Sequence, residues 1–347
     1  MTGFQWRGRG SWNRVCRREG KPNKMRRRDF ISVLGAAIAV PLHASAQQRP
    51  RRLAVAAGFT EEEMKPLLDA LLAQLKVHGW ILGQNLTLEA RYGGGAYSVE
   101  QVKALIATAP DVIVTQGTGM LNIVRKETTT LPIVFTMVPD PVKLGIVESI
   151  ARPGGNITGF TNFEFSIAGK WLEFLKAIRP GIKGVLVICN PDNPNNVQFA
   201  KAVGDEGRSF GIEAVTLNVR TGAEIAPAIT KAAEQRSGFA VLALPDSLLI
   251  LNRAVITDTA LQLGLPGMYP FRVFADGTGL IAYGLNLFDM HRDTAVYVDR
   301  ILKGEKPGNL PVQAPTNFEL VINLKVAKQL GIEMPPALLA RADAIIE

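Results

Sequence analysis

The chain has 347 residues and a formal net charge of +8, from 39 Lys and Arg against 31 Asp and Glu. The excess of positive charge lies in the first 46 residues, because the remainder carries 29 basic and 29 acidic side chains. A neutral remainder does not support a surface for nucleic acid. Its length suits two lobes with separate cores.

The residues from Met25 to Ala46 have the order of a secretory signal. A basic start is followed by an apolar run over 31–42 and by a small-x-small end at Ala46. That run is too short to span a bilayer, so we expect a signal peptide over 25–46, cleavage after Ala46 and a periplasmic protein. Arg27 and Arg28 also fit the twin-arginine export pattern. An N-terminal membrane anchor is the alternative.

Residues 1–24 precede this signal and are rich in Arg without apolar periodicity. We interpret them as disordered, or as the product of a start site upstream of the natural one. Cleavage would remove Cys16 and leave only Cys189, which rules out an internal disulfide. No cysteine stands at the cleavage site, which argues against a lipid anchor.

The first half of the remaining chain alternates strand-like and helix-like segments. Apolar residues recur at i, i+3, i+4 and i+7 over 64–75, which predicts a helix with one buried face. The alternation of strand-like and helix-like segments predicts a parallel sheet covered by helices on both faces. We expect strands over 53–57, 85–91, 111–115 and 132–136, and helices over 64–75, 99–108, 121–127 and 142–150.

The pattern restarts after the turn-forming residues 152–156, which indicates a second lobe. The two series have similar lengths, so we expect two similar lobes. The predicted strands cover 184–189, 212–219, 239–244, 267–269 and 280–283, and the predicted helices follow 190–196 and cover 223–235 and 249–263.

Several segments spread over the chain carry a specific resemblance. They are Pro132–Phe135, Asp140–Val142, Ala151–Gly159, Tyr283–Asn286, Tyr297–Gly304, Leu310–Val312, Phe318–Leu324 and Leu339–Asp343. With them the chain resembles the ABC-transporter substrate-binding family with the periplasmic-binding-protein type I fold, in the branch of tryptophan- and tyrosine-type receptors. The resemblance covers nearly all of 51–347. Residues 271–279 depart from the family's usual Arg-Glu-Phe-Val-x-x-Gly-Gly.

The resemblance implies an α/β protein of two doubly wound parallel-sheet lobes, joined by a three-strand hinge around a ligand cleft. One lobe would comprise 51–157 and 284–311, and the other 158–283 and 312–347. The helix over 293–302 would belong to the first lobe. The implied partners are a small solute and an ABC permease, with no nucleic acid and no membrane contact except through the permease. We expect a monomer with no cofactor and no catalytic residue.

Ligands of open α/β sheets bind beyond the carboxyl ends of the strands. Amides at helix N-termini there suit a ligand carboxylate, and Asp246 suits an ammonium group. The resemblance also implies that this acid meets the ligand amine. Tyr269 and Tyr283 are added as apolar faces. The strand-end rule selects Phe59, Thr60, Gly117, Thr118, Val138, Asp140, Asn190, Asn193, Asp246 and Ser247.

Each of these residues has a simpler alternative role. Asp246 could serve only as a helix N-cap, and so could Thr118, Ser247 and Asp140. The aromatic residues could serve packing alone, and 190–196 is rich in turn formers.

Other classes of function find little support. Residues 117–122 resemble a dinucleotide fingerprint but lack its third glycine. His78 and His291 have no paired ligands that would suggest a metal site. A nicotinamide-dependent enzyme or a ligand-sensing domain of a receptor or repressor stays as an alternative. A repressor would need a DNA-reading helix pair where the export signal stands.

Overall fold

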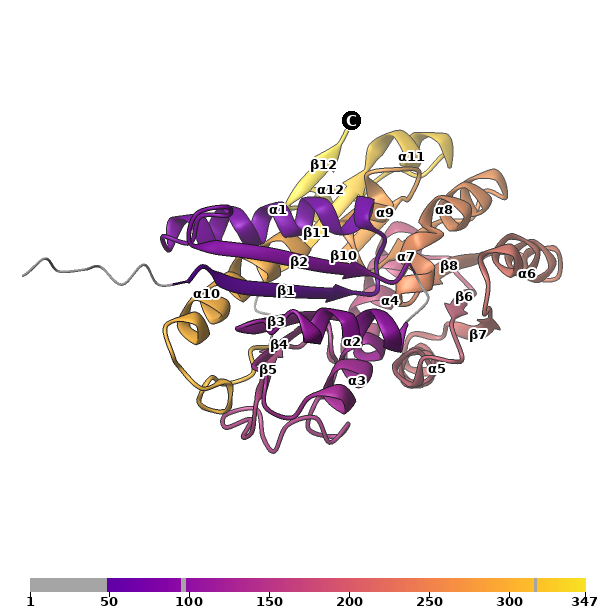
Figure 1. Ribbon diagram of the computed structural model, residues 1–347. Helices are drawn as coiled ribbons and strands as arrows, with labels where there is room; N and C mark the ends of the chain where they lie inside the picture. Colours follow the sequence, from indigo (N-terminus) through magenta and orange to yellow (C-terminus); the bar gives the residue numbers. More distant parts are fainter. Residues whose placement is uncertain (1–48, 95–97, 315–316) are drawn as a thin grey trace, which may run out of the picture. The chain divides into compact units, whose positions relative to one another are not determined.

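The structure is a computed structural model that describes residues 49–94, 98–314 and 317–347, so the predicted signal peptide and residues 1–24 lie outside it. The described part forms one compact unit over 49–347 that contains two sheets (Figure 1). The first has the order β2-β1-β3-β4-β5, and all its pairs are parallel. Its strands are β1 (Arg51–Ala57), β2 (Leu86–Tyr92), β3 (Val112–Gln116), β4 (Ile133–Thr136) and β5 (Ile157–Phe160).

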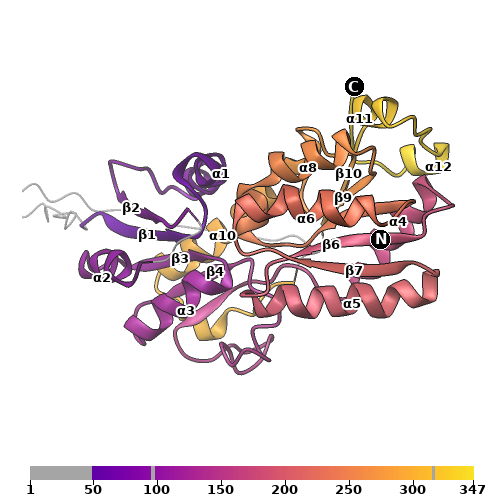
Figure 2. The ribbon, with the colours of Figure 1, turned by 90° about the vertical axis from the view of Figure 1, so that its right-hand side faces the viewer.

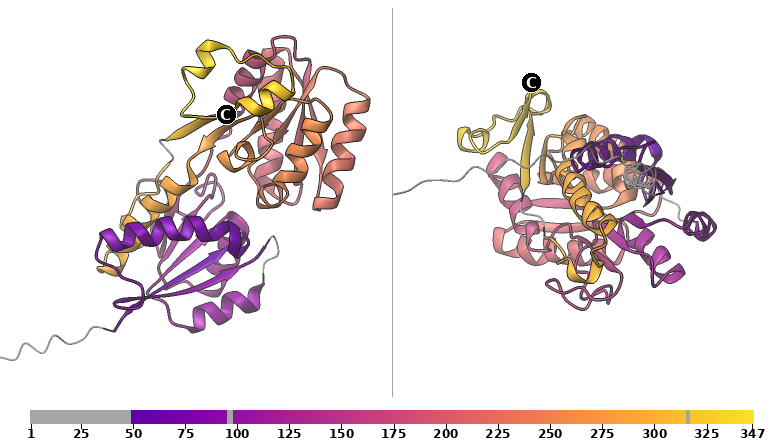
Figure 3. Two further views of the ribbon diagram at one scale, coloured as in Figure 1. Left: turned by 90° about the horizontal axis from the view of Figure 1, so that it is seen from above. Right: turned by 60° about the vertical axis from the view of Figure 1, so that its left-hand side comes forward.

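The strands β1, β3, β4 and β5 are buried along nearly all of their length, as their apolar sequences predict, whereas the edge strand β2 is partly exposed. Along β1, Leu53 and Val55 pack into one core cluster, whereas Ala54 and Ala56 pack into the other. On the first face lie α1 (Glu61–Val77) and α10 (Leu287–Leu302), which pack against each other (Figure 3). On the second lie α2 (Val99–Ala107) and α3 (Thr118–Glu127).

The second sheet has the order β12-β11-β10-β9-β8-β6-β7, and β10 and β11 are its antiparallel pair. Helices surround it (Figure 2). Its strands are β6 (Gly184–Cys189), β7 (Glu213–Asn218), β8 (Phe239–Ala243), β9 (Gly267–Tyr269), β10 (Ile281–Leu285), β11 (Phe318–Asn323) and β12 (Ala344–Ile346). The helices of this half are α4 (Ile167–Ile178), α5 (Pro194–Phe210), α6 (Gly222–Glu234), α7 (Ser247–Leu251), α8 (Arg253–Gln262), α9 (Arg272–Ala275), α11 (Leu324–Gln329) and α12 (Pro336–Leu339), and a short 3-10 turn, η1 (Pro307–Asn309), follows α10.

The chain passes between the two sheets three times: after β5, after β10 and before β11. Residues 158–160, expected in the second lobe, belong to β5 and hence to the first sheet. Space is tight at two passages. A side chain at Gly159 would collide with the Phe135 backbone, and one at Gly284 with the carbonyl oxygen of Pro270.

Three expected helices differ from the structure. The segment 142–150 forms turns and bends, and the backbone just before it has positive φ at Met137 and Asp140, which a helix does not adopt. The helix expected over 249–263 is divided at Asn252 into α7 and α8. The helix expected to start at 293 begins at Leu287, because the side chain of Asn286 caps it.

Candidate functional site

A cavity of about 440 Å³ lies at the carboxyl ends of strands from both sheets. The loops after β3 and β4 face it from the first sheet, and those after β6 and β8 from the second. We call it the polar cavity, because eleven of its twenty lining residues have amide, hydroxyl or charged side chains. The predicted residues that line it are Gly117, Thr118, Asn190, Asn193, Asp246 and Ser247.

Asp246 is a buried carboxylate with 7% of its surface exposed. One oxygen accepts from the backbone N–H of Leu248 at 2.8 Å, so the predicted N-cap of α7 is present. The other accepts from the side-chain amide of Asn193 at 2.8 Å, and Asn190 donates to the carboxylate at 3.3 Å. A carboxylate offers about four acceptor positions. Three donors therefore leave room for a further donor from a solute.

Three other amides of the lining have an unpaired oxygen. Gln116, Asn122 and Asn162 each carry a buried side-chain oxygen that has no hydrogen-bond partner among the described residues. Gln116 is 1% exposed and Asn162 is 5% exposed. A buried acceptor without a partner costs about 1–3 kcal/mol. A solute with N–H or O–H donors would relieve that cost, so the lining favours a donor-rich solute.

The N-terminus of α3 opens on the same cavity. Its cap residue, Gly117, has φ +86° and offers no side-chain acceptor to the first turn. By contrast, the side chain of Asn193 caps α5 by accepting from the N–H of Asn195. First-turn N–H groups without a cap and the positive end of a helix dipole suit a carboxylate. The α3 N-terminus therefore offers the cavity a place for an anion.

Charge in the lining leaves one carboxylate without a cation. Asp192 forms an ion pair with Arg220 at 3.2 Å, and both are exposed at the edge. Asp246 is the third charged residue of the lining. Its described contacts are amide and backbone donors, so the cavity has a net charge of about −1. The apolar part of the lining consists of Met137, Pro139, Leu144, Pro194, Phe199, Pro245 and Leu248.

A second cavity, of about 490 Å³, shares no lining residue with the polar cavity. Phe59 and Thr60, two of the predicted residues, line it. So do Phe271 and Arg272 from the segment that departs from the family pattern. Thr60 completes a capping box with Glu63 at the start of α1.

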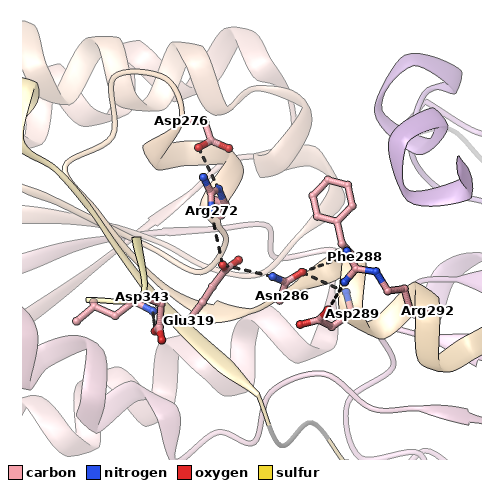
Figure 4. A network of polar contacts seen from close by, with 9 residues as sticks. Arg272, Asp276, Asn286, Phe288, Asp289, Arg292, Glu319 and Asp343 are labelled. Carbon is pink, nitrogen blue, oxygen red and sulfur yellow. Dashed lines mark hydrogen bonds and ion pairs between the residues drawn. The ribbon is translucent and has the colours of Figure 1, made fainter. Parts of the chain in front are cut away.

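A polar network borders this second cavity where β10 passes into α10 (Figure 4). Asn286 caps α10 and donates to Glu319 at 3.4 Å. Arg272 lies 4.0 Å from Glu319 and 3.2 Å from Asp276. Burial raises the pKa of Glu319, and Arg272 offsets only part of that rise. The network joins β11, α9 and α10 at one passage between the sheets.

The other four predicted residues line neither cavity. Val138 is fully buried in the core of the first sheet. Asp140 is exposed, and its carboxylate accepts from the N–H of Lys143. Tyr269 is 1% exposed and stacks on Phe274. Tyr283, which is half-buried, packs against two phenylalanines, Phe174 and Phe318.

Several residues of the polar cavity were missed. Asn162 lies on the passage after β5, and Asn195 lies within the first turn of α5. Asn195 donates to Thr118 at 3.4 Å, a hydrogen bond between the two halves of the cavity. Phe199 lies one turn further along α5 and packs against Trp171. The only signal for these contacts in the sequence was the high Asn content of 190–196.

Reactive or metal-binding chemistry has little support in the described part of the chain. Burial and the charge of Asp246 raise the pKa of the Cys189 thiol to about 11, so it stays protonated. Within residues 49–94, 98–314 and 317–347 no group of three His, Cys, Asp or Glu could hold a metal ion. None of the helices in those ranges is long and apolar enough to cross a bilayer.

Comparison with known proteins identifies the family. The family described as ABC transporter substrate binding protein matches residues 61–346. The chain belongs to this family. As a member, the protein is a solute-binding component of ABC import, and it has the periplasmic-binding-protein type I fold.

Three known proteins are similar to this substrate-binding protein over most of their length. The Tyrosine-binding protein of Clostridioides difficile (strain R20291) is 24% identical over 283 residues, which cover 80% of this chain and 81% of that protein. The crystal structure of a conserved domain protein from Vibrio cholerae is 28% identical with a TM-score of 0.80, over 86% of this chain and 100% of that one. An ABC domain from Streptococcus pneumoniae in complex with L-Trp is 21% identical with a TM-score of 0.78, at the same coverage.

Proposed function

We propose that this substrate-binding protein captures a free amino acid with an apolar or aromatic side chain in the polar cavity. The observation that carries the proposal is the pairing of opposite sites in one cavity. The uncapped N-terminus of α3 suits a carboxylate. Asp246, with its spare acceptor position, and the unpaired oxygens of Gln116 and Asn162 suit an ammonium group. Phe199 and Leu248 supply apolar surface for the side chain.

The names of two relatives support this class of solute, since one is a tyrosine-binding protein and the other contains L-Trp. A cavity of about 440 Å³ lies in the range of small-molecule sites. The proposal includes binding without catalysis, delivery by a monomer to an ABC permease, and no cofactor.

The proposed recognition of both charged groups predicts a strict ligand preference. We expect L-tryptophan or L-tyrosine to raise the melting temperature, with about 2.7 kcal/mol of added stability at 100 times Kd. Tryptamine lacks the carboxylate and indole-3-propionate lacks the amine. Each should bind at least about 30-fold more weakly, because a charged group of the cavity loses its partner. Titration calorimetry measures the affinity for each of these compounds. If indole-3-propionate bound as tightly as L-tryptophan, Asp246 would not pair with the ammonium group of the solute.

We also propose that residues 25–46 form a signal peptide that exports the protein to the periplasm. The export route is either general secretion or the twin-arginine pathway. The family works outside the cytoplasm, and the basic, apolar and Ala-x-Ala order of these residues supports the assignment. Mass spectrometry of protein from the native host should find Gln47 as the first residue. Replacing Arg27 and Arg28 by Lys should block export by the twin-arginine route, whereas unchanged export would leave general secretion. A wholly cytoplasmic pool would contradict export itself.

A further inference from the structure

An ion pair joins the two halves of the molecule at a distance from the polar cavity. Arg253 of α8 donates to Glu63 of α1 at 2.7 Å, across 190 positions of the sequence. Helix α1 packs on the first sheet, and α8 packs on β9 of the second. The side chains are 37% and 15% exposed, and both line the second cavity. The ion pair therefore links one lobe to the other, near the segments where the chain crosses between the two sheets.

Each partner is held by its own lobe. One oxygen of Glu63 accepts from the hydroxyl and N–H of Thr60, at 3.2 and 3.4 Å, which completes the capping box of α1. The other oxygen takes the bond from Arg253. Arg253 also donates to the carbonyl oxygen of Ile250 at 3.0 Å, in its own half. Both side chains are thus oriented locally, which lowers the entropy lost when an ion pair forms.

We propose that Glu63 and Arg253 form an interlobe latch, a positioning pair that holds the lobes together around the polar cavity and prolongs the residence of the solute there. Neither residue lines the polar cavity, so neither contacts the solute. The longer residence time of the solute rests on the proposed function, whereas the contact between the lobes through this ion pair does not. Opening the lobes breaks the ion pair, and its loss should therefore speed solute release without slowing solute entry.

The chain offers variants that separate the latch from helix capping. Glu63→Gln removes the charge but keeps the capping box, because Gln also completes that motif. Arg253→Met removes the guanidinium and keeps the apolar stem. The matched control is Asp69→Asn, which breaks an ion pair of 2.8 Å with Lys65 that lies wholly within α1 and is exposed at both ends.

Stopped-flow release of L-tryptophan from the full chain gives the first test. We expect each latch variant to release it about three- to tenfold faster, with an association rate that does not fall and a melting temperature that is nearly unchanged. Asp69→Asn should match the wild type. The double variant should release no faster than either single variant, because one interaction is lost in all three. Arg253→Lys should restore part of the slow release. Equal release rates in wild type and variants, or effects that add in the double variant, would overturn the latch.

A second measurement needs no solute and keeps the two proposals apart. Solution scattering of the solute-free chain should give a larger radius of gyration for Arg253→Met than for the wild type and for Asp69→Asn. An unchanged radius would overturn the tie between the lobes. If the wild type binds neither L-tryptophan nor L-tyrosine, the proposed solute is wrong, and the scattering comparison still decides the latch.

Discussion

Replacing Asp246 by Asn is expected to weaken the binding of an amino-acid solute about 30-fold or more and to leave the protein folded. Asn is as good an N-cap as Asp, so the bond to the N–H of Leu248 can persist. The charge opposite the ammonium group is lost, and removing one partner of a buried charge pair costs about 2–5 kcal/mol. The bond from the Asn193 amide is lost, because the Asn193 oxygen is held by the cap of α5, so we also expect a loss of stability of about 1–3 kcal/mol.

Calorimetric titration with L-tryptophan or L-tyrosine measures the effect. Asp192→Asn is the matched control, because Asp192 also lines the polar cavity but already has Arg220 as its cation at the exposed edge. We expect that control to change affinity less than about threefold, as for other exposed pairs. Asp246→Ala should lose both affinity and about 1 kcal/mol of capping. Near-normal affinity in Asp246→Asn would restrict Asp246 to the cap of α7.

Much of the fold was predictable from the sequence, because each buried parallel strand is a recognisable run of apolar residues. Each is a short apolar run, and each ends where turn formers begin, so β3, β4, β6 and β8 lie within about one residue of their predicted bounds. The segment 142–150 shows the limit of such patterns. Ile146 and Val147 are buried and have helical spacing from Val142 and Ile150, yet these last two are about 40% exposed. The backbone turn before them was not visible in the apolar spacing.

The strand-end rule located the polar cavity, whereas Tyr269 and Tyr283, which were added for their apolar faces, lie outside it. Gly117, Asn190 and Asp246 follow strands of parallel sheets, and such positions share one edge. Tyr269 and Tyr283 lie within strands, where the direction of a side chain depends on register rather than on composition. Residues such as Asn162 reach the cavity only through the passage of the chain between sheets, which no local pattern encodes.

Acidification from neutral pH to pH 4 is expected to remove roughly 3 kcal/mol of stability through His291 alone. This side chain is fully buried on α10, where Nδ1 lies 2.7 Å from the carbonyl oxygen of Leu287. Its Nε2 has no partner among the described residues. Burial lowers the pKa of His291 from 6.5 to about 4, and the bond to Leu287 offsets only part of that shift. The folded protein therefore keeps this imidazole neutral.

The direction of the pH effect follows from which state takes up the proton. Between pH 6.5 and 4 the unfolded chain binds a proton at His291 that the folded chain excludes, so the free energy of unfolding falls as the pH falls and levels off below about 4. Urea unfolding of wild type and His291→Gln at pH 7 and pH 4.5 measures it. The carboxylates titrate alike in both proteins. The difference between their losses of unfolding free energy on acidification therefore gives the contribution of His291. His78→Gln is the control, because that ring is 27% exposed. If His291→Gln loses as much stability on acidification as the wild type does, the buried imidazole does not govern the acid response.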